Sequence, residues 1–181
     1  MPEAKINLAI LNEMVTNRGM TLHELSEVQP VLLVFLRHFG CTFCREALAD
    51  ISKERSNIEK MGTKIVFVHM TNAALAERYF TRYEIEDATH ICDPEQTSYK
   101  AFGLLKGNFN QLFGLQSWIR GFNAGVVSGH GVGSQLGDGF QMPGVFVIHK
   151  GEVIERFIHK MASDRPDYME LAKCCQIVPR V

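Results

Sequence analysis

Residues 31–46 read VLLVFLRHFGCTFCRE, an apolar run followed by a short turn and a pair of cysteines. A continuous apolar run of this length, rich in branched side chains, is typical of a strand that is covered on both faces of a sheet. Beyond the cysteines, apolar residues recur at helical spacing until Gly62. Cys41 and Cys44 are therefore predicted to lie where a buried strand turns into a helix.

The rest of the chain alternates between strand and helix patterns. Strands are predicted at residues 65–68, 89–92, 145–148 and 153–158, the last two as a hairpin with its turn at 150–151. Helices are predicted at residues 6–18, 73–83 and 164–174, with a helical turn opening at 93–94. This alternation indicates an α/β fold in which a central mixed β-sheet is flanked by helices.

The length and composition favour one domain. The chain has 181 residues, 46% of them hydrophobic, which is enough to bury one core. We expect residues 1–181 to form this single domain. Residues 104–142 are rich in glycine and aromatic residues and are interpreted as an insertion within it.

The charge balance excludes some partners. The formal net charge is −1, so the excess of basic residues that draws proteins to nucleic acids or anionic membranes is missing, and neither partner is expected. No stretch approaches the ~20 apolar residues of a membrane span. The polar N-terminus and the odd number of five cysteines favour a cytoplasmic protein without a disulfide framework.

The two-residue gap between Cys41 and Cys44 suits thiol–disulfide chemistry. The amides and dipole at a helix N-terminus stabilise a thiolate, and the second sulfur reaches the first after one helical turn. We assign Cys41 as the attacking thiol and Cys44 as the resolving thiol. Arg37, His38 and Arg45 flank the pair and can add positive charge. This chemistry requires no organic cofactor and no metal.

A second group of residues is expected to complete the active-site loop. Met142 and Pro143 directly precede the strand at 145–148. The proline either marks the boundary of that strand or forms a cis-proline loop that packs against the cysteines and offers backbone groups to an extended substrate. Thr42 and Phe43, between the cysteines, belong to the same predicted site.

Several motifs carry a family resemblance. They are the turn at 39–46, the strand exit at 91–94, the segment 98–104 and the strand 146–148 with its turn at Gly151. In these motifs the chain resembles the peroxiredoxin-like branch of the AhpC/TSA (alkyl hydroperoxide reductase/thiol-specific antioxidant) family. The resemblance implies an antioxidant enzyme with a thioredoxin-like fold, an N-terminal extension and an insertion before the cis-proline-type loop.

The chain departs from the motif of typical peroxiredoxins, Pro-x-x-x-Thr-x-x-Cys. Arg37 stands in place of the proline, Cys41 in place of the threonine, and Cys44 in place of the peroxidatic cysteine. The resemblance therefore implies an alternative activity, a thiol peroxidase or lipid endoperoxide reductase in which Cys44 attacks. In thioredoxins a buried Asp lies behind the cysteines, and this chain has Phe35 there.

The leading hypothesis is a thiol-dependent oxidoreductase that acts on a disulfide or peroxide and is reduced by a thioredoxin- or glutathione-type thiol system. A non-catalytic binding module and a redox-sensing zinc binder are the rivals. Cys92 is predicted to be a small core residue. Cys174 and Cys175 are either structural or a source of another resolving thiol. The histidines show no ligand spacing and are interpreted as structural or surface residues (His69, His90, His149 and His159).

Overall fold

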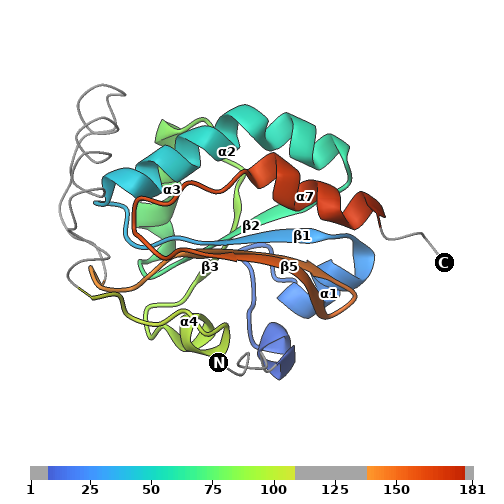
Figure 1. Cartoon of the computed structure of the whole chain (residues 1–181), viewed down its shortest axis with the longest axis horizontal. Helices are drawn as coiled ribbons and strands as arrows, with labels where there is room; N and C mark the ends of the chain where they lie inside the picture. Colours follow the sequence, from blue (N-terminus) through green and yellow to red (C-terminus); the bar gives the residue numbers. More distant parts are fainter. Residues whose placement is uncertain (1–7, 109–137, 178–181) are drawn as a thin grey trace.

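A five-stranded mixed β-sheet forms the centre of the computed structural model, which describes residues 8–108 and 138–177 (Figure 1). The strands are β1 (Val31–Phe35), β2 (Lys64–His69), β3 (Thr89–Cys92), β4 (Gly144–His149) and β5 (Glu152–Ile158). They lie in the order β3-β2-β1-β4-β5. β1, β2 and β3 are parallel, whereas β4 is antiparallel to both β1 and β5. The predicted α/β fold with a mixed sheet is confirmed.

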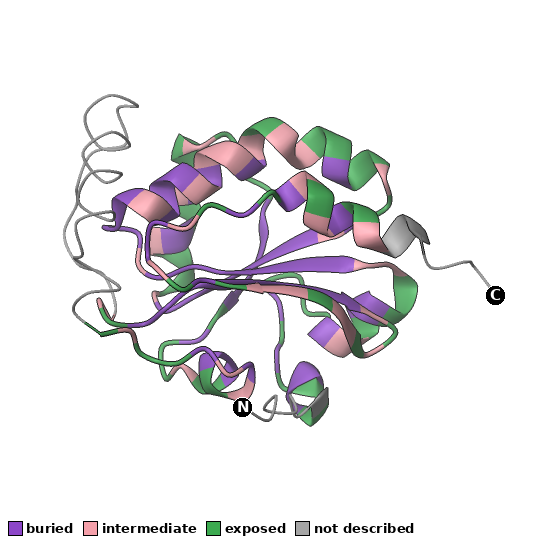
Figure 2. Ribbon diagram, viewed as in Figure 1, coloured by how far each residue is buried: buried purple, intermediate pink, exposed green. Residues whose placement is uncertain are grey.

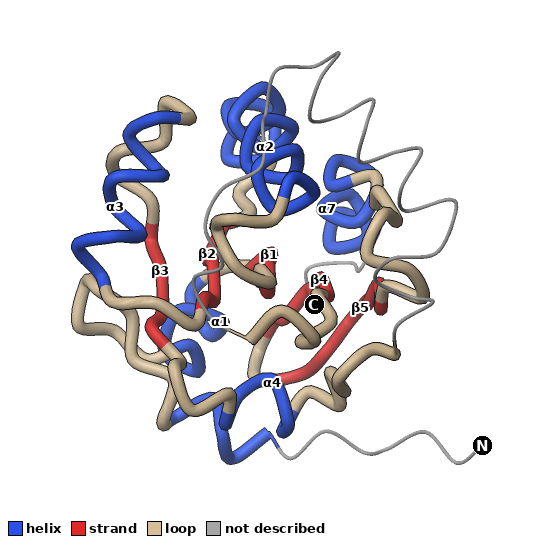
Figure 3. Tube along the Cα trace, turned by 90° about the vertical axis from the view of Figure 1, so that its left-hand side faces the viewer, coloured by secondary structure: helices blue, strands red, loops and turns tan. Residues whose placement is uncertain are grey.

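Helices cover both faces of this sheet (Figure 3). The helical elements are the 3-10 helix η1 (Leu8–Asn12) and the α-helices α1 (Leu22–Val28), α2 (Thr42–Lys60), α3 (Ala73–Arg82), α4 (Thr97–Ala101) and α7 (Tyr168–Ile177). α2, α3 and α7 pack on one face, and η1, α1 and α4 on the other. None of the described helices has the length and apolar composition needed to cross a membrane.

The central strand β1 is buried along its whole length, as its apolar run predicts (Figure 2). Leu32 and Val34 pack in the apolar cluster under α2, while Leu33 and Phe35 belong to the cluster on the opposite face. β1 therefore runs through the middle of the core. Its carboxyl end, and the turn that follows, are therefore held in a fixed position.

Two helix predictions need correction. The predicted helix at 6–18 is described only from residue 8, as the short 3-10 helix η1, and the chain then turns into α1, which was not predicted. α1 begins with a capping box in which Thr21 and Glu24 satisfy each other's backbone amides. The turn predicted to open at 93–94 is present as a hydrogen-bonded turn from Asp93 to Gln96, but the helix α4 begins only at residue 97, where the Asp93 carboxylate accepts hydrogen bonds from the amides of Thr97 and Ser98.

The hairpin of β4 and β5 agrees with the sequence. Lys150 and Gly151 connect the strands, both with positive φ (51° and 69°), as a tight turn between antiparallel strands requires. Most of the predicted insertion lies outside the described residues. Its two described ends meet, since Lys106 pairs with Gln141 in a β-bridge and its ammonium lies 2.7 Å from the Asp138 carboxylate.

Candidate active site

Cys41 and Cys44 lie on the turn from β1 into α2, as the sequence predicts. Cys41 is the N-cap residue of α2, and its amide donates to the His38 carbonyl at 2.9 Å, which closes the turn. Cys44 follows in the first turn of the helix. Both cysteines are free thiols and are largely buried, with 8% and 4% of their surface exposed.

Arg37 contacts both sulfur atoms. Its guanidinium Nη1 donates to Cys41 Sγ at 3.1 Å, and its backbone amide donates to Cys44 Sγ at 3.1 Å. The side chain is buried and is held in this orientation by two further hydrogen bonds, from Nε to the Gln141 carbonyl at 3.1 Å and from Nη2 to the Gly139 carbonyl. A fixed positive charge therefore lies against the first cysteine.

The pKa values of the two thiols are shifted in opposite directions. The pKa of Cys41 falls to about 6, first because the Cys44 thiol hydrogen-bonds to it, and then because of the Arg37 charge and the amides of the helix N-terminus, which together outweigh burial. The pKa of Cys44 is raised well above its usual value by burial and by the neighbouring Cys41. At neutral pH the pair thus combines a thiolate at Cys41 with a thiol at Cys44.

The other two flanking basic residues have different positions. Arg45 donates from Nε to the Phe39 carbonyl at 2.8 Å, and its guanidinium lies 5.5 Å from the centre of the Tyr79 ring. Burial, with the charges of Arg37 and Arg45, lowers the pKa of His38 to about 4, so this imidazole is neutral at pH 7. The guanidinium of Arg37 is the charged group that donates a hydrogen bond to the Cys41 sulfur.

The loop at residues 142–143 lies beside the cysteines. Met142 is buried against Phe43 and Ala162, and Pro143 lines a cleft together with Cys44. Of the two alternatives for Pro143, the cis form is contradicted, because the described residues, Met142 and Pro143 included, contain no cis peptide bond. Thr42, the first residue of α2, is buried within the same turn.

The cleft next to Cys44 is narrow and partly open to solvent, and its cavity volume is about 20 Å³. Phe43, Pro143 and Val145 form much of its apolar wall. Cys41 is not among the residues that line the cleft, so the cleft lies on the Cys44 side of the pair.

One wall of this cleft is polar, which the sequence did not predict. Glu46 and Asp50 of α2 line it with Arg165 and Tyr168. Arg165 binds the Asp50 carboxylate through two hydrogen bonds of 2.5 and 2.6 Å and lies 3.5 Å from Glu46. The two acids are four residues apart on α2, so they share a helix face. That spacing is visible in the sequence, but their proximity to Arg165 is not.

The remaining cysteines divide into different environments. Cys92 is exposed at the end of the edge strand β3, so the prediction that it is a core residue is wrong. Its neighbours are His69 and His90, and the spacing of these three residues in the sequence does not predict that they meet. Cys174 on α7 is partly buried against the core, and the Cys175 side chain lies outside the described part of the structure.

Comparisons with known proteins agree on the type of fold and chemistry. The profile of the AhpC/TSA family matches residues 5–157. The prostamide/prostaglandin F synthase of Danio rerio is 27% identical over 176 residues, covering 94% of this chain and 86% of that protein. Among solved structures, a mutant of Peroxiredoxin 6 of Arenicola marina aligns with a TM-score of 0.62 at 12% identity, covering 90% of this chain and 67% of the other. Peroxidoxin BcpB from Mycobacterium tuberculosis aligns with a TM-score of 0.59 at 16% identity, covering 92% of each chain.

Proposed function

Because the chain belongs to the AhpC/TSA family and is an oxidoreductase, we propose that it reduces its substrate with a dithiol, Cys41 as the attacking thiolate and Cys44 as the resolving thiol. The opposite pKa shifts of the two thiols, with the Arg37 guanidinium 3.1 Å from Cys41 Sγ, carry this proposal. A nucleophile must be ionised near neutral pH, while the second thiol has to stay protonated until the first has reacted.

The reaction with a disulfide proceeds in two exchanges. The Cys41 thiolate attacks one sulfur of the substrate, a mixed disulfide forms, and the other substrate sulfur leaves as a thiolate. Cys44 then loses its proton and attacks Cys41 Sγ, which forms the Cys41–Cys44 disulfide and releases the second substrate thiolate. That proton passes to water or to the departing substrate thiolate. A thioredoxin- or glutathione-type thiol returns the two electrons.

A peroxide enters the same cycle. The Cys41 thiolate attacks the terminal oxygen of the hydroperoxide and becomes a sulfenic acid as the O–O bond breaks, and the alkoxide takes a proton from water and leaves as an alcohol. Cys44 condenses with this sulfenic acid, so that water leaves and the same disulfide forms. The two reactions differ in their leaving groups and end in the same Cys41–Cys44 disulfide.

The position of the cleft favours a second candidate function. Cys44 lines the cleft and Cys41 does not, which suits a thiol peroxidase or lipid endoperoxide reductase in which Cys44 attacks. The apolar wall formed by Phe43, Pro143 and Val145 fits a lipid substrate, and the similar Danio rerio protein is named prostamide/prostaglandin F synthase. The pKa of Cys44 opposes this assignment. Because its thiol is largely protonated at neutral pH, we favour Cys41.

Single-cysteine variants distinguish the two candidates. Reduced Cys44→Ser and Cys41→Ser proteins are each given a disulfide peptide, an alkyl hydroperoxide and a lipid endoperoxide, and the modified cysteine is mapped by mass spectrometry. The proposal expects Cys44→Ser to accumulate a mixed disulfide or sulfenic acid at Cys41, and Cys41→Ser to be inert. Cys174→Ser is the matched control and should react as the unchanged protein does.

The reverse pattern, with Cys44 modified in Cys41→Ser and the Cys44→Ser protein inert, would establish the second candidate. A protein in which neither cysteine reacts with any of the three substrates would instead be a binding module with the fold of a redoxin.

A further inference from the structure

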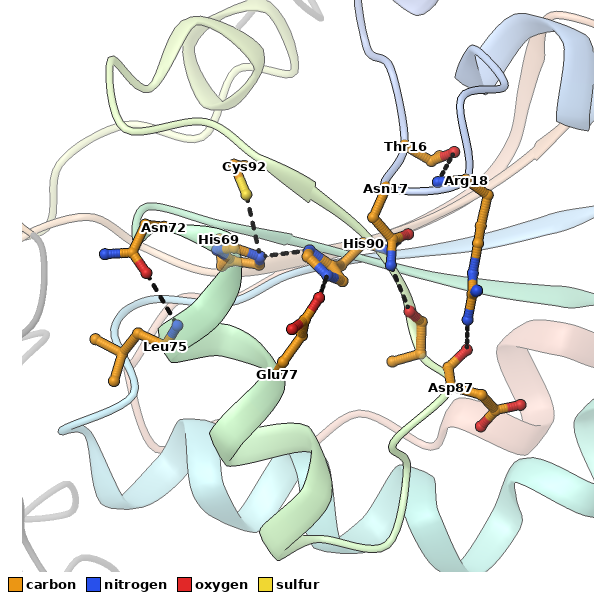
Figure 4. A network of polar contacts seen from close by, with 11 residues as sticks. Thr16, Asn17, Arg18, His69, Asn72, Leu75, Glu77, Asp87, His90 and Cys92 are labelled. Atoms are coloured by element: carbon orange, nitrogen blue, oxygen red, sulfur yellow. Dashed lines mark hydrogen bonds and ion pairs between the residues drawn. The ribbon is translucent and has the colours of Figure 1, made fainter.

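Three potential metal ligands meet at the edge of the sheet (Figure 4), and none of them lines the cleft beside Cys44. His69 ends β2, and His90 and Cys92 lie two residues apart on β3. The strands pair so that His69 lies opposite Cys92. Since alternate residues of a strand point to the same face, all three side chains share the face that α3 covers.

The ligand atoms are close together. His69 Nε2 lies 2.9 Å from His90 Nδ1 and 3.8 Å from Cys92 Sγ. One ligand atom from each of the three residues lies within 4.8 Å of the others. Two imidazole nitrogens and a thiolate form a donor set that suits Zn²⁺.

The two imidazoles are held in fixed positions. Each has only 1% of its surface exposed, and the two nitrogens that face each other, His69 Nε2 and His90 Nδ1, share one hydrogen bond. A neutral imidazole has a lone pair to offer a metal, so an ion bound between these nitrogens replaces that hydrogen bond.

A carboxylate lies near the second nitrogen of His90. Glu77 Oε1 of α3 is 4.0 Å from His90 Nε2, which is too long for a hydrogen bond. Ligating histidines commonly direct their second N–H toward a carboxylate, and a small movement of the exposed Glu77 side chain would complete that contact. Cys92 is exposed, so an ion can reach the cluster from solvent.

We propose that His69, His90 and Cys92 bind one Zn²⁺ ion, through His69 Nε2, His90 Nδ1 and Cys92 Sγ, with water as the fourth ligand. Cys92 loses its thiol proton to solvent on binding, and the two imidazoles stay neutral, each with its N–H on the nitrogen that faces away from the ion. No electron is transferred. The site is separate from the proposed dithiol chemistry and does not depend on it.

The geometry needs only local adjustment. Zinc bonds of about 2.0–2.1 Å to nitrogen and about 2.3 Å to sulfur, at tetrahedral angles, place two nitrogens about 3.3 Å apart and a nitrogen and a sulfur about 3.6 Å apart. The observed 2.9 and 3.8 Å differ from these values by a few tenths of an ångström. Rotation of the exposed Cys92 side chain brings its sulfur closer to His90.

The test uses the full chain with Cys41→Ser and Cys44→Ser, so that the dithiol cannot bind the metal. Under anaerobic conditions Co²⁺ is titrated in, and Zn²⁺ is then added as a competitor. We expect one equivalent of Co²⁺ to produce visible bands of tetrahedral cobalt and a sulfur-to-cobalt charge-transfer band, and Zn²⁺ to abolish both. ¹⁵N NMR of the imidazoles is expected to show zinc-induced shifts at His69 and His90.

Cys92→Ser is the decisive variant in this background, because its exposed position leaves the core intact. It is expected to lose the charge-transfer band and to bind zinc at least about tenfold more weakly, since even outer-shell changes commonly cost 10–100-fold. Cys174→Ser, the matched control, should bind as the parent does. Absence of binding, an unchanged charge-transfer band in Cys92→Ser, or imidazole signals that do not respond to zinc would each overturn the proposal.

Discussion

The Nη1 atom of Arg37, two residues after the end of β1, lies 3.1 Å from the sulfur of Cys41, the N-cap residue of α2. The same guanidinium is hydrogen-bonded to the carbonyls of Gln141 and Gly139. The Arg37 guanidinium thus contacts both the attacking thiol of the proposed reaction and a segment about a hundred residues later in the chain. This relationship leads to the first two predictions.

Arg37→Gln should raise the pKa of Cys41 by about one unit. The substitution removes a charge-assisted hydrogen bond, of the kind that contributes about 1.5–3 kcal/mol, and one pKa unit corresponds to about 1.4 kcal/mol. The pKa is measured from the pH dependence of alkylation at Cys41, followed by mass spectrometry. Arg55→Gln removes an arginine that pairs with Asp87 on the surface and is the control. Equal pKa values in both variants would exclude Arg37 as a cause of the shift.

The alkylation rate of Cys41 in the unchanged protein should follow a single pKa of about 6. A thiolate reacts and a thiol does not, so lowering the pH through this pKa protonates Cys41 and slows the reaction. The rate at pH 5 is expected to be about tenfold below the rate at pH 8. A rate that continues to rise through pH 8 and 9 would show that the pKa of Cys41 is not depressed.

Tyr99→Phe should destabilise the fold by about 1–3 kcal/mol. The buried hydroxyl of Tyr99 donates to the carbonyl of Leu36, next to Arg37, and lies 3.1 Å from the carbonyl of Val68. Removing it leaves a buried carbonyl at the end of β1 without that donor. The free energy of unfolding is measured by urea denaturation. The hydroxyl of Tyr79 accepts a longer hydrogen bond, 3.4 Å, from Arg45, so Tyr79→Phe should lower the free energy of unfolding clearly less.

Gly144→Ala should cost about 1–3 kcal/mol of stability by overpacking. A methyl group at Gly144 would lie 2.6 Å from Leu104 Cδ2 and 3.2 Å from Phe146 Cε2, which is too close for both contacts. Shortening the neighbour should relieve the clash, so the double variant with Leu104→Ala is expected to be more stable than the sum of the two single losses. Additive losses in urea denaturation would contradict this explanation.

The sequence was sufficient for the features that depend on local pattern. The apolar run at 31–36 and the helical spacing after it predict β1, the turn and the helix that follows, because the covered faces of strands and helices impose their own periods on the chain. The position of Cys41 and Cys44 on that turn follows from the same two patterns. The two turns of α1 contain too few residues to establish a period, so the sequence does not predict this helix. The helical spacing at 6–18 predicts a longer helix than the 3-10 helix η1, which spans Leu8–Asn12.

Tertiary structure alone decided which distant groups meet. Nothing in the spacing of Arg37, Gln141 and Gly139 shows that the guanidinium is held by these carbonyls and so turned toward Cys41. Cys92 is exposed at the end of β3, whose other three residues are buried, and it meets His69 because β3 pairs in parallel with β2 in one particular register. Strand order and register are set by packing across the whole sheet, and a residue's own neighbours in the sequence do not contain that information.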